Sequence, residues 1–307
     1  RAILVSIFFL SHCLMINLIQ ITLLPLLLIS PALFRKGVSQ TERWFGVVLI
    51  AMSQLFAPTS FVLTGQGPEW WEEGLTSRAL GEPFIAPRSV LIANHQIYTD
   101  WIYLWHLAYL ANRDGDVKII LKDSLKRIPL FGWGMRIMRF IFLSRQWGKD
   151  QRILSDYLEQ YNACKDENLC LFLFPEGTVP SPNTRPKSKA HAEKMGLKDP
   201  RHCLLPHTTG LSFTLAHLGS SITHVHDVTI GYEGVPPGSY PQYTYDLVKT
   251  YYHSKAPPRV HMHLRSWPIE KVPYADSETF NSWLQDRWAE KDDLLDTFYT
   301  QGSFPSE

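Results

Sequence analysis

The amino-acid sequence has 307 residues, 45% of them hydrophobic, which excludes a disordered or collagen-like chain and suits one large α/β domain or two smaller ones. Its 30 Lys and Arg against 29 Asp and Glu leave a formal net charge of +1, so no overall field attracts a polyanion and we expect no nucleic-acid partner. Charged residues make up 19% and aromatic residues 13%, a balance that favours contact with lipid.

The N-terminus carries an uncharged apolar run at 2–34. At about 1.5 Å per helical residue, this run is long enough for a hydrocarbon layer of about 30 Å. A second uncharged run, 44–63, follows a short polar loop that holds Arg35, Lys36, Glu42 and Arg43. We predict a membrane-anchoring helical hairpin over residues 1–64. Prolines at 25, 31 and 58 interrupt helical hydrogen bonding, so two full crossings and a hairpin resting in one leaflet both stay open.

The remaining residues, 65–307, form a predicted catalytic domain with an α/β pattern. After a Gly/Pro/Glu-rich linker at 65–87, short β-branched or apolar runs alternate with amphipathic segments. The predicted strands are 90–93, 117–121, 140–144, 169–174, 227–232 and 259–264, and the predicted helices include 149–165, 209–218 and 277–299. We therefore expect a mixed, mostly parallel sheet flanked by helices, preceded by the membrane helical hairpin.

A histidine and an aspartate five positions apart, His95 and Asp100, follow the first predicted strand of this domain and precede an apolar segment. Such strand ends are where α/β folds gather their sites. Five helical residues turn through about 500°, so the side chains meet only if His95 lies in the turn and Asp100 in the first helical turn. The carboxylate would then hold one imidazole nitrogen and leave the other to take a proton. A purely structural histidine is the alternative.

Two further features suggest ligand binding. Residues 174–178, Phe-Pro-Glu-Gly-Thr, end another predicted strand, and Gly177 can open a tight loop beside a ligand. Lys122 and Arg145 flank an apolar helix and strand, and arginine suits bidentate phosphate binding. A plain turn is the alternative for the first feature, and a solvated surface is the alternative for the two cations.

Together these segments resemble the motifs of the glycerolipid acyltransferase family, also called the lysophosphatidate acyltransferase or PlsC-type family. The first motif, Asn-His-x4-Asp, corresponds to Asn94, His95 and Asp100. The second, Lys-x2-Leu-x3-Pro-x2-Gly ending in Arg, corresponds to 122–145. The third, Phe-Pro-Glu-Gly-Thr, is present at 174–178. A fourth block resembles 205–210, and the sequence is most similar to the lysocardiolipin and epsilon-type lysophosphatidate acyltransferase branch. That branch often has arginine where this chain has His207. The resemblance covers roughly residues 85–300.

The resemblance implies that a fatty acyl group moves from acyl-CoA, the co-substrate, to the free hydroxyl of a lysophospholipid. The acceptor would be of the lysophosphatidic acid or the lysophosphatidylinositol/lysocardiolipin type. His95 would be the general base, and Asp100 would fix its tautomer. The implied substrate-binding residues are Asn94, Lys122, Arg145, Glu176, Gly177, Thr178, Arg185 and Lys187. The resemblance also implies membrane lipids as partners and a membrane location, at the endoplasmic reticulum.

These residue types suit the chemistry independently. A thioester is already activated, so no covalent nucleophile is needed, and the sequence has no G-x-S-x-G elbow. Backbone N–H groups near the turn that carries His95 are expected to hold the oxyanion. We expect no cofactor. We also expect no metal, because the pairs His224/His226 and His261/His263 lack a completing Cys or carboxylate set. A CoA-independent phospholipid transacylase and a non-catalytic lipid-binding scaffold remain as rival functions.

Overall fold

The structure is a computed structural model that describes residues 1–65 and 84–305, so most of the predicted linker at 65–87 lies outside the described residues. Its helices are α1 (Ala2–Leu23), α2 (Leu26–Ile29), α3 (Pro31–Phe56), α4 (Asp100–Leu110), α5 (Phe131–Ile137), α6 (Trp147–Asn162), α7 (Arg185–Met195), α8 (Thr208–Leu218), α9 (Pro241–Thr244) and α10 (Ser277–Gln301). Its strands are β1 (Ser60–Gly65), β2 (Arg88–Ala93), β3 (Val117–Lys122), β4 (Ile141–Leu143), β5 (Leu169–Leu173), β6 (His224–Tyr232) and β7 (Arg259–Pro268).

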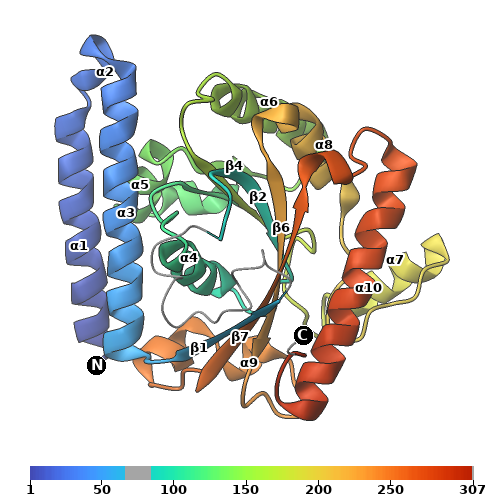
Figure 1. Cartoon of the computed structure of the whole chain (residues 1–307). Helices are drawn as coiled ribbons and strands as arrows, with labels where there is room; N and C mark the ends of the chain where they lie inside the picture. The colour runs from blue at the N-terminus through green and yellow to red at the C-terminus, as the bar shows by residue number, and fades with distance from the viewer. Residues whose placement is uncertain (66–83, 306–307) are drawn as a thin grey trace.

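The described strands form one seven-stranded sheet in the order β1-β7-β6-β2-β5-β3-β4 (Figure 1). All neighbouring pairs are parallel except β6 and β7, which are antiparallel. The predicted mixed, mostly parallel sheet is therefore confirmed, and each predicted strand overlaps an observed one. Helices flank both faces: α4, α5 and the N-terminal helices pack on one, and α6, α8 and α10 pack on the other.

Strand β1 was not predicted. Its first residues, 60–63, belong to the second uncharged run, which the sequence pattern assigns to the helical hairpin. Helix α3 instead ends at Phe56, shortly before Pro58, a residue that cannot continue a helix. The chain then extends beside β7 with Ser60 opposite Arg259, so the end of the run belongs to the sheet.

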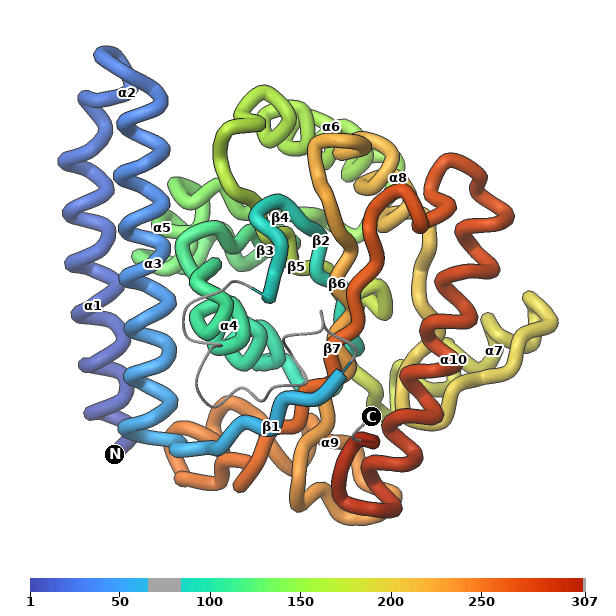
Figure 2. Tube along the Cα trace, viewed as in Figure 1, coloured from blue at the N-terminus to red at the C-terminus, as the bar shows by residue number. Residues whose placement is uncertain are grey.

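Helices α1 and α3 form the predicted hairpin and lie side by side, with α2 at the turn (Figures 1 and 2). The predicted polar loop is wrong in position, because its charged residues, Arg35, Lys36, Glu42 and Arg43, lie in the first half of α3. Ser30 caps that helix by accepting from the Leu33 N–H at 3.4 Å, and Pro31 occupies the first turn, where its missing N–H has no partner to lose. The hairpin turn is therefore at residues 24–30.

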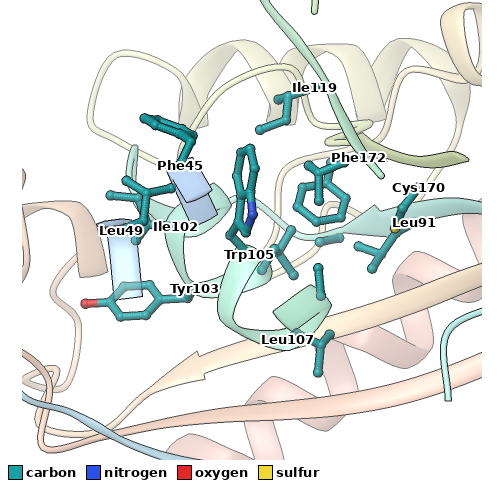
Figure 3. Close-up of a cluster of buried hydrophobic side chains, with 14 of the residues drawn as sticks. Phe45, Leu49, Leu91, Ile102, Tyr103, Trp105, Leu107, Ile119, Cys170 and Phe172 are labelled. Carbon is teal, nitrogen blue, oxygen red and sulfur yellow. The ribbon is translucent and has the colours of Figure 1, made fainter. Parts of the chain in front are cut away.

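Helix α3 approaches α4 closely at a glycine. A Cβ at Gly46 would lie only 2.4 Å from Nε1 of Trp105, so any larger residue would push the two helices apart. Trp105 is fully buried, and its indole N–H donates to the Asp114 carbonyl at 3.1 Å. Figure 3 shows this ring between the hairpin residues Phe45 and Leu49 and the sheet residues Ile119 and Phe172. The hairpin thus shares the hydrophobic core of the α/β domain.

Helix α10 is fixed to β6 through buried charges. Lys291 is fully buried; its ammonium pairs with Asp227 and donates to the Val228 carbonyl at 2.8 Å. Asp227 also accepts from Arg265 at 2.7 Å. A buried charge is costly unless it is paired, and this group of side chains compensates its members. At the start of the helix, the Asp276 side chain caps it by accepting from the Thr279 N–H at 2.8 Å.

Candidate active site

The carboxyl ends of four neighbouring parallel strands bring the main candidate residues to one edge of the sheet. His95 follows β2, Glu176 follows β5, Lys122 ends β3 and Arg145 follows β4. In open α/β sheets, ligands bind in the crevice outside these strand ends. Residues from three separate sequence blocks therefore meet because their strands pair.

His95 and Asp100 meet in the geometry that the sequence predicted. Helix α4 begins at Asp100, His95 lies in the preceding turn, and imidazole Nδ1 is 2.8 Å from Asp100 Oδ2. The same oxygen accepts from the N–H of Gln96 at 2.6 Å and of Ile97 at 3.1 Å. The Asp100 side chain is completely buried, so these donors compensate its desolvation and fix its orientation.

Tyr232 is a third member of this group that sequence reasoning missed. It is the last residue of β6, is fully buried, and donates its hydroxyl to Oδ1 of Asp100. Burial and the nearby Asp100 charge raise the pKa of Tyr232 well above its ordinary value, so it stays a hydrogen-bond donor. The available signal was positional, since β6 is parallel to β2 and both strands end at the same edge of the sheet.

The imidazole of His95 is held flat against an aromatic ring. It stacks on Phe174 with ring centroids 4.4 Å apart and an interplanar angle of 25°. Asp100 occupies Nδ1, so Nε2 is the nitrogen left for a substrate, and the His95 side chain is 13% exposed. A partly exposed imidazole with one fixed nitrogen meets the geometric requirement for a general base.

The turn amides do not match the expected oxyanion site. The N–H of His95 donates to Glu176, those of Gln96 and Ile97 donate to Asp100, and that of Tyr98 donates to Gln242 Oε1 at 2.6 Å. Carboxylate and amide side chains already accept from these four amides, so an oxyanion would need other backbone N–H groups near the turn.

Glu176 connects the histidine turn to a second loop. Its Oε1 accepts from the His95 N–H at 3.0 Å, and its Oε2 accepts from the Leu204 N–H at 2.9 Å. Burial raises the pKa of Glu176 to about 8, although both backbone donors act to lower it. The residue borders the cavity described below, but its oxygens are used within the protein, so it positions His95.

Side chains from two helices, α7 and α10, hold the loop that reaches Leu204. Asp292 in α10 accepts from the backbone N–H groups of residues 201–203 at 2.6–3.2 Å. Ser188 in α7 accepts from the Leu205 N–H at 2.9 Å, and the Arg185 guanidinium donates to the carbonyls of residues 200, 201 and 203. Arg185, a predicted substrate-binding residue, therefore braces this loop.

A cavity of about 660 Å³ opens beside His95. Its apolar lining includes Ile120, Leu121, Leu143, Leu154, Leu173 and Leu211, from β3, β4, α6, β5 and α8. The polar lining includes Lys122 and Arg145, both exposed, and neither side chain has a hydrogen-bond or ion-pair partner among residues 1–65 and 84–305. A cavity with apolar walls and two unpaired cations at its exposed part suits an amphiphile with an anionic group.

The other predicted binding residues divide into two groups. Gly177, with a φ of 68°, and Thr178 line the cavity. Asn94 is buried and exchanges two hydrogen bonds with the Ile230 backbone, so it joins β2 to β6. Lys187 lies exposed on α7 and is not among the cavity-lining residues. The structure thus separates residues that face the cavity from those that brace it or lie outside it.

His207, in the fourth block of the resemblance, lines the cavity. Its ring is close to Gly177 and has its centroid 6.3 Å from that of His191. Partial desolvation at the cavity wall and the neighbouring His191 lower the pKa of His207 below its ordinary value of 6.5. The fourth block therefore contributes a neutral imidazole at pH 7.

The histidine pairs outside this site have structural partners. His226 is buried, accepts from the Ala86 N–H at 3.0 Å and contacts Ser266 at 2.7 Å. His261 packs against Phe298 with ring centroids 4.9 Å apart. Among the residues that the structure describes, no group of three or more His, Cys, Asp or Glu side chains could hold a metal ion.

Comparison with known proteins agrees with this architecture. The family model described as Acyltransferase matches residues 78–233, and the one described as Acyltransferase C-terminus matches residues 254–307. The chain therefore belongs to the acyltransferase family, which confirms the resemblance inferred from its motifs.

Three relatives illustrate the similarity. An acyltransferase of Schizosaccharomyces pombe is 38% identical, over 92% of this chain and 80% of its own length. The 2-acyl-1-lysophosphatidylinositol acyltransferase of Saccharomyces cerevisiae is 35% identical, over 97% of this chain and 84% of the relative. Lysocardiolipin acyltransferase 1 of Gallus gallus is 34% identical, over 91% of this chain and 68% of the relative.

Proposed function

We propose that this protein transfers a fatty acyl group from acyl-CoA to the free hydroxyl of a lysophospholipid of the lysophosphatidylinositol or lysocardiolipin type. The single observation that carries the proposal is the His95–Asp100 contact at 2.8 Å, beside a cavity of about 660 Å³. Relatives named for lysophosphatidylinositol and lysocardiolipin acylation support the acceptor class. Lysophosphatidic acid remains an acceptor to test beside them.

In this mechanism, Nε2 of His95 takes the proton of the lysophospholipid hydroxyl as its oxygen attacks the thioester carbonyl carbon. Asp100 keeps the other nitrogen protonated and stabilises the imidazolium that forms. The tetrahedral intermediate then collapses, the carbon–sulfur bond breaks, and the imidazolium returns its proton to the CoA sulfur. The products are one ester and one free thiol, and His95 ends in its starting state.

The acceptor phosphate would bind at the exposed part of the cavity. Lys122 and Arg145 supply the positive charge there, and Arg145 can bind two phosphate oxygens at once. Gly177 and Thr178 would border the head group from the β5 side. The acyl chains of the two substrates are apolar. The apolar wall of this cavity and the bilayer can together accommodate them.

We infer that the hairpin of residues 1–64 anchors the domain to the membrane. We also infer that α1 and α2 rest in one membrane leaflet, so that neither α1 nor α3 crosses the bilayer. Among the described residues, one segment, Ala2–Ile29, is long and apolar enough to cross. Its exposed apolar side chains include Ile3, Leu4, Ile7, Leu14, Leu18, Ile21, Leu28 and Ile29. Two full crossings are disfavoured because the charges of α3 pair with the catalytic domain: Glu42 with Lys118 at 2.6 Å, Arg43 with Asp114 at 3.8 Å, and Arg35 with Glu167.

Vesicle binding tests the one-leaflet arrangement. Leu28 and Ile29 are 93% and 77% exposed at the hairpin turn, so a Leu28→Glu/Ile29→Glu variant should bind phospholipid vesicles more weakly than a Gln40→Glu control on α3. A Ser30→Cys variant in sealed vesicles should not react with an impermeant maleimide added on the side opposite the catalytic domain. Labelling from that side would show that the hairpin crosses. Endoplasmic reticulum location is a further proposal, tested by co-fractionation of the full chain with that membrane.

The proposed reaction is tested with radiolabelled acyl-CoA and lysolipids that differ only in head group. We expect labelled diacyl product and free CoA in equal amounts. Formation of product from a labelled phospholipid donor, without CoA release, would instead indicate the transacylase. If no lysolipid is acylated from either donor, the non-catalytic scaffold is favoured.

A further inference from the structure

The loop between β4 and α6 holds Arg145 in a backbone conformation that non-glycine residues rarely adopt. Arg145 has a φ of 66°, in the left-handed region, where its Cβ crowds the neighbouring carbonyl. Such strain persists only where the surrounding structure enforces it, and it gathers at ligand-binding sites. The residue that carries it here is one of the two unpaired cations of the cavity.

The carboxylate of Asp150, in the first turn of α6, enforces this conformation from both sides. Its Oδ1 accepts from the N–H and the hydroxyl of Ser144, both at 2.8 Å, and its Oδ2 accepts from the N–H of Gln146 at 2.8 Å. The Asp150 residue is 3% exposed and borders the same cavity. One buried carboxylate therefore bridges the residue before Arg145 and the residue after it.

We propose that Asp150 is the positioning residue for Arg145, and that it fixes the loop so that the guanidinium can receive the phosphate of the lysophospholipid acceptor. The proposal rests on the proposed function, because that function supplies the phosphate. A guanidinium on a fixed backbone loses less conformational freedom on binding than one on a mobile loop. Fixing the backbone of Arg145 should therefore strengthen the binding of the lysophospholipid acceptor. The structure thus assigns to Asp150 a role in acceptor recognition through Arg145, without contact with the reacting atoms.

The first test compares Asp150→Asn with Asp156→Asn. Asp156 lies on the same helix, is exposed, and has no side-chain partner among the described residues, so the control removes one carboxylate from α6 without altering the loop. In Asp150→Asn, an amide NH2 must face a backbone N–H, because the carboxylate accepts on both oxygens. We expect the KM for the lysophospholipid to rise about tenfold, as for loss of a charged hydrogen bond. The kcat and the KM for acyl-CoA should change less than about threefold.

A double variant separates positioning from general loop damage. If Asp150 acts through Arg145, then Asp150→Asn should have no further effect on the acceptor KM in an Arg145→Ala background. Arg145→Gly should raise the melting temperature, since glycine adopts this φ without strain, and should still raise the acceptor KM. Should Asp150→Asn not fold, Asp150→Glu takes its place, because it keeps the charge at the helix start and moves the carboxylate by one methylene.

Three results would overturn the proposal: an unchanged acceptor KM, an equal rise in the Arg145→Ala background, or a rise confined to acyl-CoA. None of these results touches the proposed function, which depends on His95. Loss of transfer in His95→Ala together with a normal acceptor KM in Asp150→Asn would reject the positioning role alone. Full activity in His95→Ala would reject the proposed chemistry whatever Asp150 does.

Discussion

Tyr232 and His95 bind opposite oxygens of the same buried carboxylate. The Tyr232 hydroxyl donates to Oδ1 of Asp100, while Nδ1 of His95 lies 2.8 Å from Oδ2. The carboxylate is therefore fixed at both ends, and it cannot rotate without losing one of these partners. The orientation of the proposed base thus depends on a residue from β6 as well as on the turn that carries it.

Removing the Tyr232 hydroxyl should slow the reaction. A hydrogen bond to a charged group contributes about 1.5–3 kcal/mol, so we expect Tyr232→Phe to lower kcat by roughly tenfold or more, with little change in either KM. Steady-state kinetics check this. Tyr245→Phe is the matched control, since that hydroxyl donates to the Glu233 carbonyl at 2.5 Å and not to Asp100. Equal rates in the two variants would contradict the role of Tyr232.

The buried Glu176 carboxyl should make stability depend on pH. Its pKa is raised from 4.5 to about 8 in the folded chain, so between these values the folded protein holds a proton that the unfolded chain has released. The free energy of unfolding should therefore fall as the pH rises from 5 to 8. Denaturant unfolding in detergent should give a smaller fall for Glu176→Gln, whereas exposed Glu193→Gln should follow the wild type. Parallel curves for the wild type and Glu176→Gln would count against this assignment.

A cation at position 207 should change the preference for the head group. A phosphomonoester carries about −1.5 to −2 charges at pH 7, more than a phosphodiester. His207→Arg adds positive charge to the cavity beside Gly177, so we expect the KM for lysophosphatidic acid to fall several-fold relative to that for lysophosphatidylinositol. Gln151→Arg adds the same charge on the exposed side of α6 as a control. An equal change for both acceptors would mean that His207 does not contact the head group.

The close approach of α3 to α4 should not tolerate a methyl group. A Cβ at Gly46 would lie 2.4 Å from Nε1 of the fully buried Trp105, so Gly46→Ala should destabilise the protein by about 1–3 kcal/mol. Gly148→Ala, in open space on α6, should be neutral or stabilising by up to about 1 kcal/mol. Thermal unfolding of both variants in the same detergent distinguishes them. A stable Gly46→Ala protein would mean that the hairpin can shift relative to the domain.

The sequence allowed the sheet, the hairpin and the His95–Asp100 contact to be predicted, because each depends on local periodicity or on residues close in the chain. Tyr232 could not be found in this way, since its contact with Asp100 depends on the pairing of β6 with β2. Arg185 looked like a free cation because the carbonyls that it binds follow 15 to 18 residues later.

The boundaries of the hairpin were misread for a related reason. Charged residues after Phe34 suggested a loop, but they pair with residues of the catalytic domain that lie far along the chain, as Glu42 does with Lys118. Charge pattern alone cannot distinguish a solvated loop from a helix whose charges have tertiary partners. Ser30 and Pro31 were the local signals for a helix start, and they agree with the observed beginning of α3.

The rate of acyl transfer by His95→Ala tests the central claim most directly. The purified variant is assayed with radiolabelled acyl-CoA and the best lysophospholipid acceptor, beside His253→Ala, which removes an exposed histidine away from the cavity. We predict that His95→Ala lowers kcat by about 10² to 10⁴ while its thermal unfolding matches that of the wild type, and that His253→Ala keeps the full rate. A folded His95→Ala protein that transfers acyl groups at the wild-type rate would contradict the account.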